Sequence, residues 1–161
     1  MDSISCKPKC LCTLKYAYTK KVPLIVGSGD SGKSTATYPA ASKGVIAVSA
    51  IGTDNRTAAS NTGEWVSVSA PGTNIVSTSS TNNSKIQENY ATLSGSSVAA
   101  AYVAGEMALI RSKYPTLDML GLRNHLELTS DDLGQPGPDN QTGFGRTNIV
   151  KSLNTIPPSQ K

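Results

Sequence analysis

The stretch LSGSSVAAAYVAG at residues 93–105 decides the predicted fold. A loop of small residues precedes apolar residues at helical spacing, and Ser97 stands where the loop becomes the helix. A hydroxyl in the first turn of a helix lies beside unpaired backbone N–H groups and the positive end of the helix dipole. The N–H of such a serine can face the oxyanion that forms when the hydroxyl attacks a carbonyl. The local pattern is compatible with a nucleophile at Ser97, but on its own it favours a serine that caps a buried helix.

The flanking segments predict an α/β fold with a mostly parallel sheet in a three-layer arrangement. Apolar runs at 22–26, 44–51 and 65–68 are expected to be buried strands, because a run that is apolar on both faces suits a parallel sheet covered by helices. Helices are expected at 14–21, 98–113 and 116–129, with Thr116 as the N-cap of the last of these. The 161 residues suffice for one domain with a single core.

Composition and charge exclude several classes of protein. Hydrophobic residues make up 37% and charged residues 16% of the chain, which is typical of a globular protein rather than a coiled coil or a charge-driven disordered chain. The net charge of +4 arises from lysines within residues 1–21. No basic stripe with stacking aromatics is present, so nucleic-acid binding is not expected. No apolar stretch is long enough to span a bilayer and no signal-peptide core follows Met1, so a membrane location is not expected. The sequence does not indicate a particular cellular compartment.

Two further motifs compete with the serine. The segment GSGDSGKS, Gly27 to Ser34, matches the phosphate-binding loop pattern and would use Lys33 to bind a nucleotide, but Pro39 falls where the required helix should continue. Asp30-Ser31-Gly32 matches the aspartic-protease turn, although that fold is all-β. Both matches are expected to be coincidental.

The cysteines gather near the start of the chain, at Cys6, Cys10 and Cys12. Their spacing is not that of a zinc site and no fourth ligand lies nearby, so thiols without a role are expected and no metal site is predicted.

Residues 93–105 resemble the nucleophile segment GTSMAxPHVAG of the subtilisin-like serine proteases. The chain matches that family in unbroken order over residues 14–153. The matching segments are the strand and AAGNxG turn at 22–32, the YPA and VIAV segments at 38–40 and 44–48, the approach to the APG turn at 61–72, the late helix at 122–126 and the GxGRVN element at 143–148.

The resemblance implies that Ser97 is the nucleophile of a serine endopeptidase that hydrolyses polypeptides through an acyl-enzyme. It places Asp30 at the oxyanion position, where most of the family has asparagine. It assigns one wall of the substrate pocket to Gly27, Ser28 and Gly29, with Thr37 and Tyr38 near its far side. No cofactor is implied beyond calcium, which family members often bind through loop carbonyls, and relatives are mostly secreted or found in digestive compartments.

The family's catalytic aspartate and histidine motifs precede the matching region and do not occur here. The single histidine, His125, falls on the late helix and is expected to be a surface residue rather than a base. Ser97 without a base is a weak nucleophile, so the chain alone is expected to be inactive. A subtilisin-like domain that lacks its N-terminal half would leave strand edges uncovered and require that half or a partner chain.

The predicted organisation is a basic tail with the cysteines at 1–13, the C-terminal part of a subtilase catalytic domain at 14–153, and a polar tail at 154–161. The alternative function is a catalytically dead relative that binds peptides or a partner. Ionised Asp30 has no donor for an oxyanion and would repel its charge, but a protonated Asp30 could donate, and one convertase branch of the family also has aspartate at this position.

Overall fold

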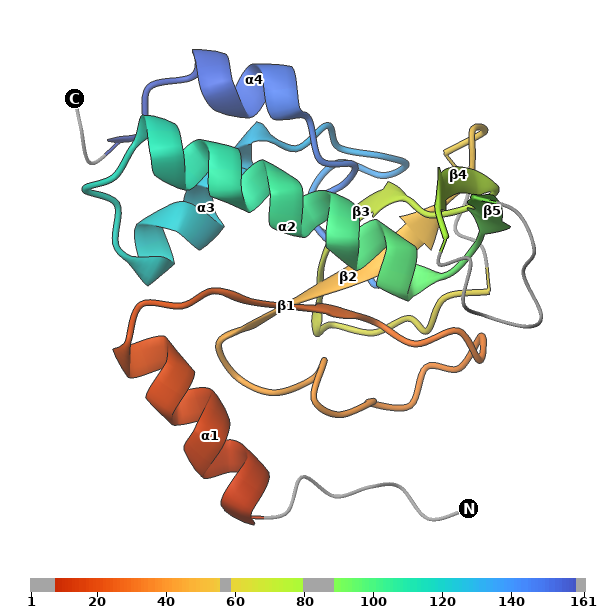
Figure 1. Cartoon of the computed structure of the whole chain (residues 1–161), viewed down its shortest axis with the longest axis horizontal. Coiled ribbons are helices and arrows are strands. Elements are labelled where there is room, and N and C mark those ends of the chain that lie inside the picture. The colour runs from red at the N-terminus through yellow and green to blue at the C-terminus, as the bar shows by residue number, and fades with distance from the viewer. Residues whose placement is uncertain (1–7, 56–58, 80–88, 159–161) are drawn as a thin grey trace.

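The computed structural model describes residues 8–55, 59–79 and 89–158. Its centre is a parallel sheet in the order β1-β2-β3, with flanking helices (Figure 1). In chain order the elements are α1 (Pro8–Thr19), β1 (Leu24–Gly27), β2 (Val45–Ile51), β3 (Val66–Pro71), β4 (Ile75–Thr78), β5 (Tyr90–Leu93), α2 (Ser96–Lys113), α3 (Met119–Thr129) and α4 (Ile149–Asn154). The predicted mostly parallel α/β fold is confirmed.

Strand β2 is the buried centre of the sheet, and all of its residues from Val45 to Ile51 are buried. Its apolar run therefore forms a strand covered on both faces, as expected for a central parallel strand. Strand β1 pairs with β2 only, and its four residues are each half-buried. Within the described residues, β1 is thus an apolar edge strand with one side unpaired.

Helix α2 runs across one face of the sheet and carries the core (Figure 1). Alanine, the best helix former, fills its first turns, and small side chains there allow close packing against the strands. Its buried stripe, Ala99, Val103, Met107 and Ile110, recurs at helical spacing and packs with Val48 and Val68 of the sheet and Leu122 and Leu126 of α3. This packing fixes the start of α2 at the carboxyl end of β1.

Several boundaries differ from the prediction. Helix α1 begins at Pro8 rather than at residue 14, so it includes the second half of the segment expected to be a tail; proline suits the first turn of a helix because its missing N–H would be unpaired there. Residues 1–7 and 159–161 lie outside the described residues. The N-cap of α3 is Asp118 rather than Thr116, and its carboxylate accepts a hydrogen bond from the Gly121 N–H at 2.7 Å.

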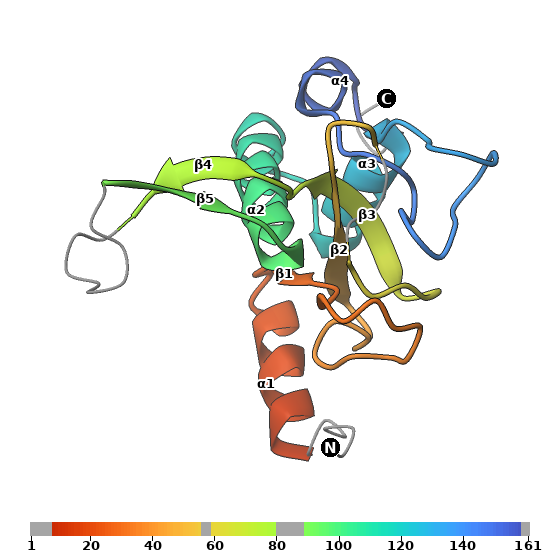
Figure 2. The same cartoon turned by 90° about the vertical axis from the view of Figure 1, so that its right-hand side faces the viewer.

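The antiparallel hairpin β4–β5 was not predicted. It extends away from the body of the molecule (Figure 2), and Val76 and Tyr90 within it are exposed. Its short strands have no buried face to give them the alternating pattern on which a strand prediction depends.

Among the described residues, no helix has the length and apolar character that crossing a membrane requires.

Candidate functional site

Ser97 lies in the first turn of α2 and is exposed. Gly95 caps this helix, with a φ of 143° that favours glycine, and no side chain caps it. The competing interpretation of Ser97 as an N-cap is therefore wrong. Within the described parts of the chain, the Ser97 hydroxyl has no hydrogen-bond partner, so it is available to a ligand or to a base from elsewhere.

Asp30, in the loop after β1, lies against the first turn of α2, which contains Ser97. Its Oδ1 accepts a hydrogen bond from the Ser96 N–H at 2.7 Å, and the Gly29 N–H donates to Ser96 Oγ at 3.0 Å. A Cβ atom on Gly95 would lie 3.1 Å from Asp30 Oδ2, so the carboxylate faces the cap of α2 directly. The two contacts join the loop after β1 to the start of α2, next to the candidate nucleophile.

Gly27 makes this approach possible. A Cβ atom there would lie 2.7 Å from Ser96 Oγ and 2.8 Å from Ser97 N, distances that force a shift of the helix start. Ser28 is fully buried beside it, and its N–H donates to the Val48 carbonyl at 2.8 Å. The end of β1 therefore packs directly against the first turn of α2.

Asn61 organises the loop that carries Asp30, and the sequence analysis did not identify this role. Its Oδ1 accepts hydrogen bonds from the N–H groups of Ser31 at 3.0 Å and Lys33 at 3.1 Å, and its Nδ2 donates to Thr37 Oγ1 at 2.8 Å. The side chain is buried. Asparagine offers both an acceptor and a donor, which a loop with unpaired backbone groups needs, but the sequence does not reveal which loop it serves.

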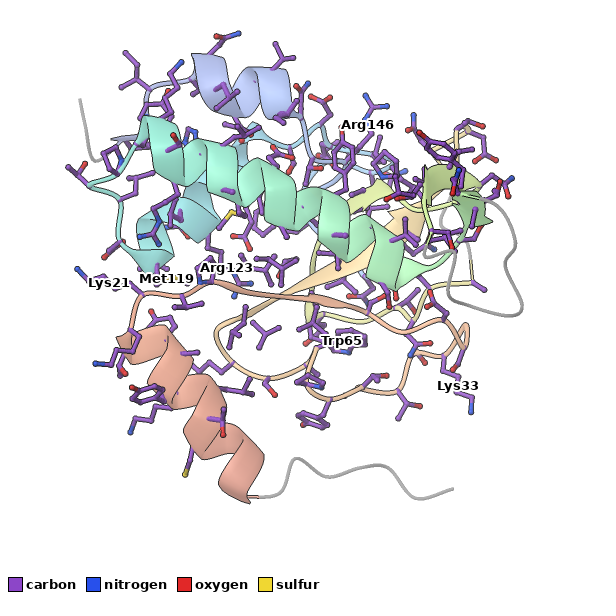
Figure 3. All side chains as sticks on the ribbon, viewed as in Figure 1. Lys21, Lys33, Trp65, Met119, Arg123 and Arg146 are labelled. Atoms are coloured by element: carbon purple, nitrogen blue, oxygen red, sulfur yellow. The ribbon has the colours of Figure 1, made fainter. Side chains whose placement is uncertain are left out.

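The structure contradicts the phosphate-loop interpretation. Residues 28–44 form turns and bends without a helix, so no helix N-terminus is aimed at a phosphate. Lys33 lies on the outer part of this loop (Figure 3) and is exposed.

Tyr38, the predicted far side of the pocket, is also exposed, whereas Thr37 is half-buried through its contact with Asn61.

His125 is buried, so its prediction as a surface residue is wrong. Its Nε2 donates to the Ser152 carbonyl at 2.7 Å, and its ring stacks edge-on against Tyr114. Tyr114 ends α2 at the far end from Ser97, a distance of about 25 Å at the 1.5 Å rise of an α-helix. His125 therefore cannot serve Ser97 as a base.

Among the residues that the structure describes, no group of three or more His, Cys, Asp and Glu side chains could hold a metal ion. The Cys12 thiol is free and exposed, and Cys6 lies outside the described residues.

Solved structures of proteases share this fold. Fervidolysin from Fervidobacterium pennivorans, a keratinolytic enzyme related to subtilisin, superimposes with a TM-score of 0.82 at 28% identity over 95% of this chain and 25% of its own chain. The subtilisin-like protease Apa1 from the Antarctic psychrotroph Pseudoalteromonas sp. AS-11 gives a TM-score of 0.83 at 19% identity over 94% of this chain and 67% of its own. The fold is therefore the subtilisin-like α/β fold.

The sequence comparisons identify the family. A family model described as the subtilase family matches residues 4–145, and the chain belongs to this family of serine proteases. Subtilisin DY of Bacillus licheniformis is 40% identical over 123 residues, which are 73% of this chain and 43% of the relative. Minor extracellular protease Epr of Bacillus subtilis (strain 168) is 40% identical over 131 residues, which are 80% of this chain and 19% of that protein. The chain thus spans less than half the length of these relatives.

Proposed function

We propose that this chain provides the nucleophile of a serine endopeptidase, with Ser97 attacking the carbonyl carbon of a peptide bond. A base removes the hydroxyl proton, the Ser97 oxygen bonds to the carbonyl carbon, and the leaving amine takes up a proton as the peptide bond breaks. Water then hydrolyses the acyl-enzyme and restores the hydroxyl. The observation that supports this proposal best is the exposed Ser97 at the start of α2, beside the loop of Asp30.

The base must come from another polypeptide segment. A general base must lie within hydrogen-bond reach of the proton that it removes. The chain contains one histidine, His125, which is buried near the far end of α2. We therefore propose that the segment carrying the family's catalytic aspartate and histidine, either the upstream half of the domain or a partner chain, docks beside Ser97, and that the chain alone is inactive.

Asp30 supports a second candidate function, a peptide- or partner-binding subtilase without activity. Its carboxylate already accepts the Ser96 N–H, and when ionised it offers no donor to an oxyanion. An amide side chain at this position would keep an acceptor for Ser96 and add a donor. If activity appears only in the Asp30→Asn variant, the chain with Asp30 is the inactive binding protein.

A fluorophosphonate probe tests both candidates. The chain is mixed with a polypeptide that carries the aspartate and histidine segments of a related subtilase, and labelling is measured by mass spectrometry of the Ser97 peptide. Labelling of the mixture but not of either part, lost in Ser97→Ala, supports the endopeptidase. No labelling of the parent mixture, together with labelling of the Asp30→Asn mixture, supports the inactive binding protein. No labelling of either mixture, when both parts are shown to associate, overturns Ser97 as a nucleophile.

A further inference from the structure

A groove lies at the opposite end of the sheet from Ser97. It has a volume of about 480 Å³ and is enclosed by α1, the starts of β1 and β2, and α3. Its floor is apolar and is formed by Leu14, Leu24, Ile46 and Met119. Met119 lies on the side of α3 that faces α1 (Figure 3). Neither the candidate nucleophile nor the Asp30 loop contributes to this groove, so it is a separate feature of the molecule.

Cations surround the groove. Lys15, Lys43 and Arg123 line it, and no acidic side chain does. The Arg123 guanidinium is held by Glu127 at 2.7 Å and by Ser67 Oγ at 3.2 Å. Lys15 and Lys43 are exposed, and across the described ranges neither ammonium forms an ion pair. Two unpaired positive charges therefore stand at the rim of an apolar groove.

We propose that this groove binds a small anionic amphiphile, such as a medium-chain carboxylate, with its alkyl chain on the apolar floor and its carboxylate between Lys15 and Lys43. The charge complementarity selects an anionic head, and the volume falls within the range of about 300–1,000 Å³ that is typical of small-ligand sites. An apolar floor without hydrogen-bonding partners in its centre suits an alkyl chain rather than a polar ligand. The proposal is independent of the activity of Ser97.

Titration calorimetry of the full chain tests this site, with decanoate kept below its micelle concentration as the probe. Each methylene buried on the apolar floor strengthens binding about fourfold, so decanoate is expected to bind about tenfold or more tightly than octanoate. The cationic decyltrimethylammonium is expected to bind more weakly than decanoate. The double variant Lys15→Gln/Lys43→Gln should weaken decanoate severalfold, whereas the matched exposed control Lys33→Gln should leave it unchanged.

A second variant separates the groove from the rest of the surface. Leu14→Glu places a negative charge on the apolar floor of the groove, at a half-buried position, and it should abolish decanoate binding while circular dichroism shows a folded chain. The proposal is overturned if decanoate does not bind, if decyltrimethylammonium binds equally well, or if Lys33→Gln weakens binding as much as the double variant. A dimer in light scattering that Leu14→Glu abolishes and that decanoate does not dissociate would assign the groove to a second copy and also overturn the proposal.

Discussion

Glu106 has a buried carboxyl group that should make the stability of this chain depend on pH in an unusual direction. Its side chain is 1% exposed, its Oε1 accepts a hydrogen bond from Ser152 Oγ at 2.7 Å, and its Oε2 has no partner among the described residues. Burial raises the pKa of Glu106 above the ordinary value of 4.5, although the Ser152 hydrogen bond acts in the opposite direction. The folded chain therefore holds this proton more tightly than the unfolded chain does.

The perturbation is Glu106→Gln, which has nearly the same shape and cannot ionise. Because the folded pKa is raised, the contribution of Glu106 to stability is full below pH 4.5 and is lost as pH rises through the folded pKa. Glutamine removes this loss, and its amide can donate a hydrogen bond to the hydroxyl of the neighbouring Thr147. One buried unsatisfied polar group costs about 1–3 kcal/mol. At pH 8 the free energy of unfolding of the variant should therefore exceed that of the parent by about that amount.

Urea unfolding followed by circular dichroism at pH 4 and pH 8 measures the difference. The variant and the parent should be similar in free energy of unfolding at pH 4 and should diverge at pH 8, with the parent less stable. The control Glu64→Gln changes an exposed carboxylate and should stay within about 0.5 kcal/mol at both values. If the free-energy difference for Glu106→Gln is the same at both pH values, the argument from burial is wrong.

Three other predictions use the contacts around the sheet. Gly27→Ala should destabilise the chain by about 1–3 kcal/mol in urea unfolding, because its Cβ atom would lie 2.7–2.8 Å from Ser96 and from Ser97 N. The control Gly105→Ala lies in open space on α2 and should stabilise the chain by about 0.5–1 kcal/mol. Equal effects of the two variants would refute the packing argument. Asp30→Asn should raise the rate of fluorophosphonate labelling in the complemented protein by about 10²–10³-fold, the reverse of the loss measured when a subtilisin loses this donor, and an unchanged rate would contradict the donor role. The pKa of Asp131 is lowered mainly by the hydrogen bond from Asn148 and further by Arg146. Asp131→Asn should therefore cost about 0.5–1 kcal/mol at pH 7 and less as pH falls below 3.8 in thermal unfolding; a cost independent of pH would exclude the charge of the carboxylate as its cause.

The parallel strands and α2 could be predicted because their apolar runs and helical spacing are local properties of the sequence. The proximity of Asp30 and Ser97 was also expected, but only the resemblance to subtilases supplied it, since spacing alone does not bring two distant loops together. The role of Asn61 could not be predicted, because it depends on which backbone groups the fold leaves unpaired. His125 was misplaced for a related reason: α4 covers α3 only in the tertiary structure, and Ser152 on α4 then buries the ring.

The unpaired side of strand β1 affects the self-association and solubility of this chain. Within the part of the chain that the structure describes, the short LIVG strand has one side unpaired, and its backbone N–H and C=O groups there can pair with an extended segment. Self-association through this side of β1 increases with protein concentration, so dilution should keep the chain monomeric more effectively than cooling. A second polypeptide that occupies this side would act as a solubility factor before it contributed anything to chemistry.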